Sequence, residues 1–177
     1  MAQLDRATLA ASVIIPHMPD LETATLMVAI AGAESAWFPE ATGDSPALLE
    51  ALGFPGSANL ARTWNCPLGS EEGPASAGLW QIFMPVWRDG LIQLGAPADP
   101  CGMLDWLIIP ANNARAAALV LSNQGFTAWS TFNDGSYLPF MSIASEAVER
   151  ARIRPNLRHI IFASAIFGLG IVVLGRL

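Results

Sequence analysis

Two short segments hold the side chains that could act together on a substrate. Glu34 and Ser35 end an apolar stretch, and residues 78–82 (GLWQI) add a glycine turn with the amide of Gln81. A carboxylic acid in a dry setting has a raised pKa and stays protonated near neutral pH. Such an acid can protonate the bridging oxygen of a glycoside. The pair therefore indicates cleavage of a sugar polymer, with Glu34 as the acid.

Glu34 also has a purely structural interpretation. It could be an exposed carboxylate at a helix end, paired with Arg62 or Arg115. The helix dipole disfavours negative charge at a helix C-terminus, which would itself help to keep the carboxyl protonated.

Residues of the second segment also have both a functional and a structural interpretation. Gln81 could donate to a sugar acetamide or hydroxyl, or it could cap its own turn. Gly78 is expected to adopt a backbone conformation that a side chain would not tolerate. Leu79 and Ile82 are predicted to be core residues.

The composition limits the class of protein. The chain has 177 residues, enough for one domain with a substantial core, and a net charge of −6 that argues against nucleic acid as the main partner. Cys66, Cys101, His17 and His159 form no cluster with the spacing of a metal site, so we expect neither a metal nor a cofactor. The two cysteines are either free thiols or a disulfide that would suit a protein working outside the reducing cytosol.

The pattern of caps and stops predicts a predominantly α-helical fold. The expected helices span about 5–15, 21–36, 46–52, 85–94, 112–124 and 139–152. Asp20 and Ser45 have the residue type and position of N-caps. A long loop over 54–74 is expected to contain one helical turn at about 58–64, and 97–110 is expected to be mostly irregular. No alternating strand pattern of length is visible.

The two ends of the chain differ from its middle. The start, 1–15, lacks the basic and apolar pattern of a secretory signal. Residues 156–177 include about 17 residues without a full charge, preceded by several arginines. This segment predicts a hydrophobic C-terminal helix that either inserts into a membrane or is buried in a larger assembly. A basic flank favours the cytoplasmic side, which conflicts with an extracytoplasmic substrate unless a virus particle delivers the protein.

Four motifs in order carry a resemblance to a known family. They are residues 31–37 (AGAESAW) with Gly43-Asp44, residues 76–82 (SAGLWQI), residues 113–117 (NARAA) and residues 129–137 (WSTFNDGSY). Together they resemble the lytic transglycosylase and goose-type lysozyme superfamily, in the versions carried by bacteriophage virion and tail proteins. The match covers roughly 21–140, so the resemblance implies a lysozyme-like domain over 1–155 with an insertion at about 46–74.

The resemblance implies cleavage of the β-1,4 bond between N-acetylmuramic acid and N-acetylglucosamine, with Glu34 as general acid and then base. In transglycosylases the substrate's acetamido group takes the place of a second carboxylate, unlike the usual two-carboxylate scheme. The resemblance also implies a set of substrate-binding residues: Ser35, Ser76, Gly78, Gln81, Phe83, Asn113, Phe132, Asn133 and Tyr137.

The sequence departs from the family at one position near the acid. Many transglycosylases place a tyrosine hydroxyl on the catalytic acid, and this chain has Phe132 in that turn. The loss of one hydrogen bond, worth about 1 kcal/mol, predicts a less well oriented Glu34. Asp134 is available as a second carboxylate, although turn aspartates usually bond their own backbone. Trp129 is predicted to be a core residue.

The leading hypothesis is a phage virion-associated transglycosylase that opens the cell wall at entry. Its partners would be peptidoglycan strands and other virion or tail proteins, or a membrane contacted through 156–177. A hydrolytic lysozyme of the same fold is the nearest alternative. A virion protein that only binds glycan or anchors to a membrane, without catalysis, is the alternative from another class, and Phe132 favours it. A host cell-division or secretion enzyme would normally carry an N-terminal signal.

Overall fold

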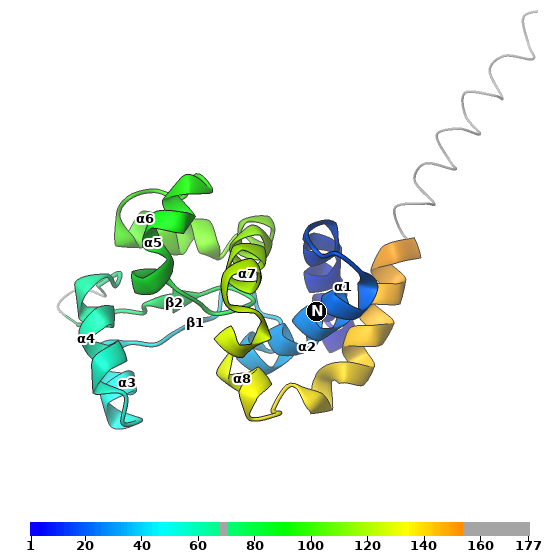
Figure 1. Cartoon of the computed structure of the whole chain (residues 1–177), viewed down its shortest axis with the longest axis horizontal. Helices are drawn as coiled ribbons and strands as arrows, with labels where there is room; N and C mark the ends of the chain where they lie inside the picture. Colours follow the sequence, from blue (N-terminus) through cyan, green and yellow to red (C-terminus); the bar gives the residue numbers. More distant parts are fainter. Residues whose placement is uncertain (68–70, 154–177) are drawn as a thin grey trace, which may run out of the picture.

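The computed structural model describes residues 1–67 and 71–153, and over these ranges the fold is predominantly α-helical. The predicted fold class is confirmed at this level (Figure 1). The hydrophobic helix predicted at 156–177 lies outside the described residues. Within the described ranges, no helix combines the length and apolar character that a membrane crossing requires.

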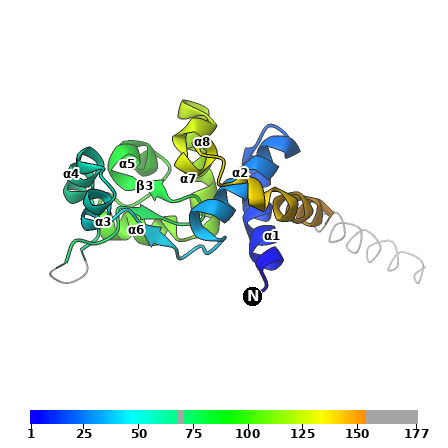
Figure 2. The same ribbon diagram turned by 90° about the horizontal axis from the view of Figure 1, so that it is seen from below.

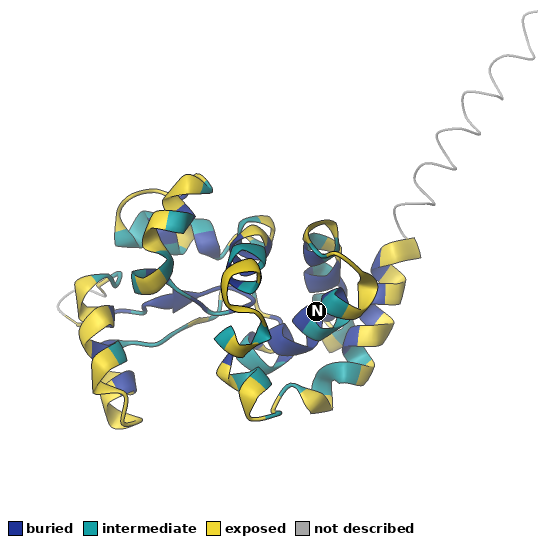
Figure 3. Cartoon of the chain, viewed as in Figure 1, coloured by how far each residue is buried: buried dark blue, intermediate teal, exposed yellow. Residues whose placement is uncertain are grey.

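Helix α2 (Leu21–Ser35) runs through the main core. Asp20 caps it by accepting a hydrogen bond of 2.7 Å from the N–H of Thr23, as the sequence predicted. Its middle is apolar on all sides and is buried from Met27 to Gly32. Figure 3 shows α2 largely in the colour of buried residues. Burial of this middle part constrains where the C-terminal residues of the helix can lie.

Other helices surround α2. They are α1 (Gln3–Ile14), η1 (Ile15–His17), α7 (Pro110–Gln124), η2 (Phe126–Ala128), α8 (Ser130–Asn133), η3 (Leu138–Phe140) and a last helix over 141–153. Of these, α1, α8 and η3 contact α2.

The rest of the fold lies on one side of this helical part (Figures 1 and 2). It consists of β1 (Thr42–Gly43), α3 (Pro46–Ala51), α4 (Pro55–Thr63), β2 (Ser76–Ala77), β3 (Ile82–Phe83), α5 (Met84–Gln93) and α6 (Pro100–Leu107). The strands form an antiparallel sheet in the order β1-β2-β3, with Gly43 opposite Ser76 and Ala77 opposite Ile82. Helices α3 and α4 have a small core of their own, formed by Leu49, Ala58, Ala61 and Ala75.

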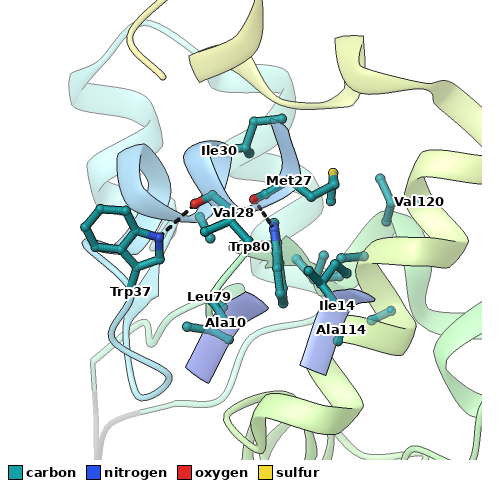
Figure 4. Close-up of a cluster of buried hydrophobic side chains, with 14 of the residues drawn as sticks. Ala10, Ile14, Met27, Val28, Ile30, Trp37, Leu79, Trp80, Ala114 and Val120 are labelled. Carbon is teal, nitrogen blue, oxygen red and sulfur yellow. Dashed lines mark hydrogen bonds between the residues drawn. The ribbon is translucent and has the colours of Figure 1, made fainter. Parts of the chain in front are cut away.

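Three buried indoles join the parts of the main core. The N–H of Trp80 donates to the carbonyl of Met27, and that of Trp37 donates to Val28, both over 2.7 Å (Figure 4). The N–H of Trp129 donates to the carbonyl of Trp80 over 2.9 Å, which confirms Trp129 as a core residue. Each indole therefore buries its ring without leaving a polar N–H unsatisfied.

Most helix predictions are confirmed within a few residues, and three local predictions need correction. The segment expected to be irregular, 97–110, contains α6, because Asp99 caps it through Gly102 and Pro100 starts it. The turn expected at 58–64 is the full helix α4. The sheet was not predicted, because strands of two residues are too short to show an alternating pattern.

Cys66 and Cys101 form a disulfide, so of the two alternatives the free thiols are excluded. The bond joins the loop after α4 to the first turn of α6. The N–H of Cys66 donates to Pro74, and the N–H of Ala75 donates to Gly43. The disulfide therefore supports the backbone that leads into β1 and β2.

Replacing both cysteines with serine should lower the free energy of unfolding by about 2–4 kcal/mol, because the 35-residue separation is no longer closed in the unfolded chain. Urea unfolding of the oxidised protein and of the double variant measures the difference. A reducing agent should move the midpoint of the wild-type protein and leave that of the variant unchanged. Equal midpoints for the two proteins would contradict this role of the disulfide.

Candidate active site

Glu34 lies in the last turn of α2, where the helix ends in an unusual way. Ala36 and Trp37 both adopt left-handed conformations, with φ of 49° and 60°. The backbone turns so that the Trp37 ring folds back into the core against Gly32. A Cβ at Gly32 would lie 2.6 Å from the Trp37 ring, so only glycine allows this approach. The helix end that carries Glu34 is therefore fixed by packing.

The carboxyl of Glu34 is half-buried and is bound by a hydroxyl group. Thr131 Oγ1 donates to Glu34 Oε1 over 2.6 Å. Burial raises the pKa of Glu34 above its ordinary value, and the negative charges of Asp44 and Asp134 add to the rise. The hydrogen bond from Thr131 opposes it. Desolvation is the largest of these causes, so the site favours a protonated acid.

The alternative in which Glu34 pairs with Arg62 or Arg115 is wrong. Arg62 binds Glu50 and Glu72, each over 2.7 Å. Arg115 donates to the carbonyl of Leu94 over 2.9 Å. Both arginines are therefore engaged elsewhere.

Asn113 is a buried residue that holds the turn facing α2, and it is not a surface amide. Its side chain is fully buried, accepts from the N–H of Trp80 and donates to the carbonyl of Ala77, both over 3.0 Å. Gly78 lies between these two residues with φ of 84°, as the sequence predicted. A Cβ there would also collide with the Asn113 amide and approach the carbonyl of Leu107 to 2.6 Å. Asn113 and Gly78 thus form one scaffold, out of reach of a ligand.

Ser35 and Gln81 also have structural contacts. The Ser35 hydroxyl is buried and lies 2.9 Å from the carbonyl oxygens of both Ala31 and Leu79, which ties α2 to the turn. The Gln81 amide nitrogen donates to Ala41 over 3.0 Å and to Gly78 over 2.8 Å. The structural interpretation of Gln81, a cap on its own turn, is the one seen.

Ser76 holds a second carboxylate near Glu34. Its buried hydroxyl donates to the carboxylate of Asp44, a half-buried residue with φ of 56°. The negative charge of Asp44 contributes to the raised pKa of Glu34, after desolvation as the main cause. Gly43 and Ser45, on either side of Asp44, line a hollow together with Thr42, Leu48, Glu72, Gly73 and Pro74. Phe83, predicted to bind substrate, packs against the core of α3 and α4 instead.

The last predicted residues lie around α8. Phe132 stacks on Phe126 and on Tyr137, with ring centroids 5.2 Å apart in both pairs. Asn133 is exposed and donates to the carbonyl of Thr127. Asp134 accepts from the N–H of Ser136, the self-contained turn expected for it, and Ser136 lowers the pKa of Asp134, first through its side chain and then through this N–H. Of this group, Asn133 is exposed and Tyr137 is half-buried.

The sequence did not indicate the two residues that, after burial, most affect the pKa of Glu34, which are Thr131 and Asp44. Phe132, in place of the family tyrosine, predicted that Glu34 lacks a hydroxyl partner. Thr131, the residue before it, supplies that hydroxyl. Asp44 was part of a quoted motif, yet it was given no chemical role. A search for hydroxyl residues within one position of Phe132 would have found Thr131. No group of three or more potential metal ligands occurs among residues 1–67 and 71–153.

Comparisons of the chain with protein-family models, with curated proteins and with solved structures found no match.

Asn113→Ala should lower the free energy of unfolding by about 2–4 kcal/mol, because it leaves the Trp80 N–H and the Ala77 carbonyl buried without partners. Denaturant unfolding measures the loss. Asn123→Ala, on the exposed side of α7, is the control and should change stability little. A variant at 113 that keeps full stability would instead assign the amide to ligand binding.

Proposed function

We propose that this protein is a peptidoglycan lytic transglycosylase that cleaves the β-1,4 bond between N-acetylmuramic acid and N-acetylglucosamine. Glu34 is the general acid and then the base. The observation that carries the proposal is the state of Glu34: a half-buried carboxyl at the end of a packed helix, with a raised pKa and one oxygen held by a hydroxyl. A general acid that works near neutral pH needs these properties.

The reaction divides into two proton transfers by the same side chain. Glu34 first protonates the glycosidic oxygen, and the bond from that oxygen to the muramoyl C1 breaks. The acetamido group of the substrate stabilises the positive charge at C1. The Glu34 carboxylate then takes the proton of the muramoyl 6-hydroxyl as that oxygen bonds to C1. The product is a 1,6-anhydro ring, no water is consumed, and Glu34 is protonated again.

The surroundings of Glu34 support this use of the site. The carboxylate of Asp44 adds negative charge near the acid and would favour a positive centre at C1. Gly43 and Ser45, the neighbours of Asp44 in the chain, line a hollow together with Leu48 and Glu72. The disulfide supports work outside the reducing cytosol. We therefore propose a virion-associated protein that acts on the host envelope at cell entry, with tail proteins or a membrane as further partners through 156–177.

Glu34→Gln should lower the rate of peptidoglycan clearance about 10²- to 10⁴-fold, because the amide cannot transfer the proton. Clearance of purified sacculi, followed by turbidity, measures the loss. Glu22→Gln, an exposed acid on the same helix, is the matched control and should clear at the wild-type rate. Equal clearance by the Glu34 variant and the wild-type protein would remove Glu34 from the mechanism.

Glu34→Gln should also become more stable relative to the wild-type protein as the pH rises. Because burial raises the pKa of Glu34 in the folded state, the folded wild-type protein binds this proton more tightly than the unfolded chain. Its stability therefore falls as pH rises from the ordinary glutamate pKa through the raised one. Thermal unfolding of both proteins from about pH 4 to pH 8 should show a gap that widens. A gap that is constant with pH would mean that the carboxyl is not desolvated.

Hydrolysis by the same fold is the second candidate, and Asp44 is the observation that favours it. A carboxylate held by Ser76 near the general acid could activate a water, as inverting glycosidases do. Asp44→Asn would then lower the clearance rate about 10²-fold or more. Under the transglycosylase mechanism Asp44→Asn removes only the stabilisation of positive charge, because the nucleophile is the 6-hydroxyl of the substrate and does not depend on Asp44. A loss below about tenfold in this variant therefore speaks against hydrolysis.

A further inference from the structure

We infer that Thr131 is a positioning residue for Glu34, whose hydroxyl fixes Oε1 as the accepting oxygen and thereby assigns the transferable proton to Oε2. The inference rests on the proposed function for its consequence in catalysis, while the assignment of the proton is a property of the folded protein alone.

The direction of the contact sets the assignment. Thr131 Oγ1 lies 2.6 Å from Glu34 Oε1 and donates to it. In a protonated carboxyl the carbonyl oxygen is the better hydrogen-bond acceptor, so a hydroxyl that donates to Oε1 favours the proton on Oε2. Glu34 Oε2 then carries the proton and can turn it toward a leaving oxygen. In the ionised state the same bond stabilises the carboxylate.

The backbone of Thr131 is held on both sides, so its hydroxyl is placed in advance. The Thr131 carbonyl accepts from the N–H of Tyr137 over 3.2 Å and from the hydroxyl of Ser136 over 3.3 Å. Two residues earlier, Trp129 is anchored in the core through Trp80. The next residue, Phe132, is stacked between two rings. A hydroxyl held in this way needs little reorganisation when Glu34 changes its charge.

None of the charged groups around Glu34 in the described part of the chain stabilises its carboxylate, so Thr131 has this role. Asp44, after β1, and Asp134, after α8, are both acids and disfavour ionisation of Glu34. On α1, the guanidinium of Arg6 donates to the carbonyl of Ala36 and covers the ring of Phe38. Segment η3 has the sequence Leu-Pro-Phe and carries no charge. Thr131 is the neighbour that lowers the pKa of Glu34, mainly through its hydroxyl and less through its backbone.

Removing the hydroxyl therefore has two effects that a loss of packing would not produce together. The pKa of Glu34 rises further, because desolvation is then opposed only by the weaker effect of the Thr131 backbone. The carboxyl also becomes free to rotate, so fewer molecules present the proton correctly. The rate at the optimum falls while the alkaline limb of the pH profile, which reports ionisation of the acid, moves to higher pH.

The test compares Thr131→Val with Thr131→Ser, which keeps a hydroxyl, and with Ser130→Ala, an exposed neighbour, as control. Thr131→Ala, which removes the hydroxyl with less bulk, is measured in parallel. We expect the Val and Ala variants to lose about tenfold in kcat, equivalent to about 1.4 kcal/mol, with the alkaline limb at higher pH. The Ser variant should stay within about threefold of the wild-type protein with an unmoved limb.

A titration that does not use activity separates this inference from the proposed function. The carboxyl carbon of Glu34 is followed by NMR against pH in the wild-type protein and in the Val, Ala and Ser variants. A higher pKa in the Val and Ala variants supports the inference even if the wild-type protein clears no peptidoglycan. An unchanged pKa in both, or a Ser variant that matches Val, would overturn it.

Discussion

The burial of the apolar middle of α2, from Met27 to Gly32, is the constraint on which the rest of the structure depends. Because the helix is apolar on every side, α1, α8, η3 and three indoles must cover it. Its last turn then lies against α8 and the turn at 77–81, whatever the chemistry requires. A glutamate at that place loses water from part of its carboxyl, and this loss is the main cause of its raised pKa. Packing of the core thus produces the electrostatic state of the acid.

The residues that resemble a sugar-cleaving site divide between scaffold and reacting surface. Ser35, Gly78 and Asn113 hold α2, the turn and α7 together, and their polar atoms are used inside the protein. Glu34, Thr131 and Asp44 form the half-buried part of the same arrangement. Several polar residues of the motifs therefore serve the scaffold of the fold.

The sequence was informative where one residue type has one local use. Asp20 and Ser45 predicted helix starts, and Gly78 predicted a left-handed turn. It was less informative where the contact crosses the fold: Thr131 meets Glu34 across 97 positions, and Asn113 meets Trp80 across 33. Such pairings depend on how helices pack, which no local pattern records. Helix α6 did carry a local signal: its Asp99-Pro100 start has the same N-cap and proline pattern as the Ser45-Pro46 start of α3.

The central claim is that a single half-buried acid passes its proton to a glycosidic oxygen and that the substrate's own 6-hydroxyl then closes the anhydro ring of the product. Mass spectrometry of the fragments released from peptidoglycan in ¹⁸O-labelled water tests this claim most directly. The account predicts muramoyl ends that are lighter by one water than the hydrolysed form and contain no ¹⁸O. Ends that carry ¹⁸O would show that water is the nucleophile, and glycan bound without any released fragment would show that Glu34 transfers no proton to it.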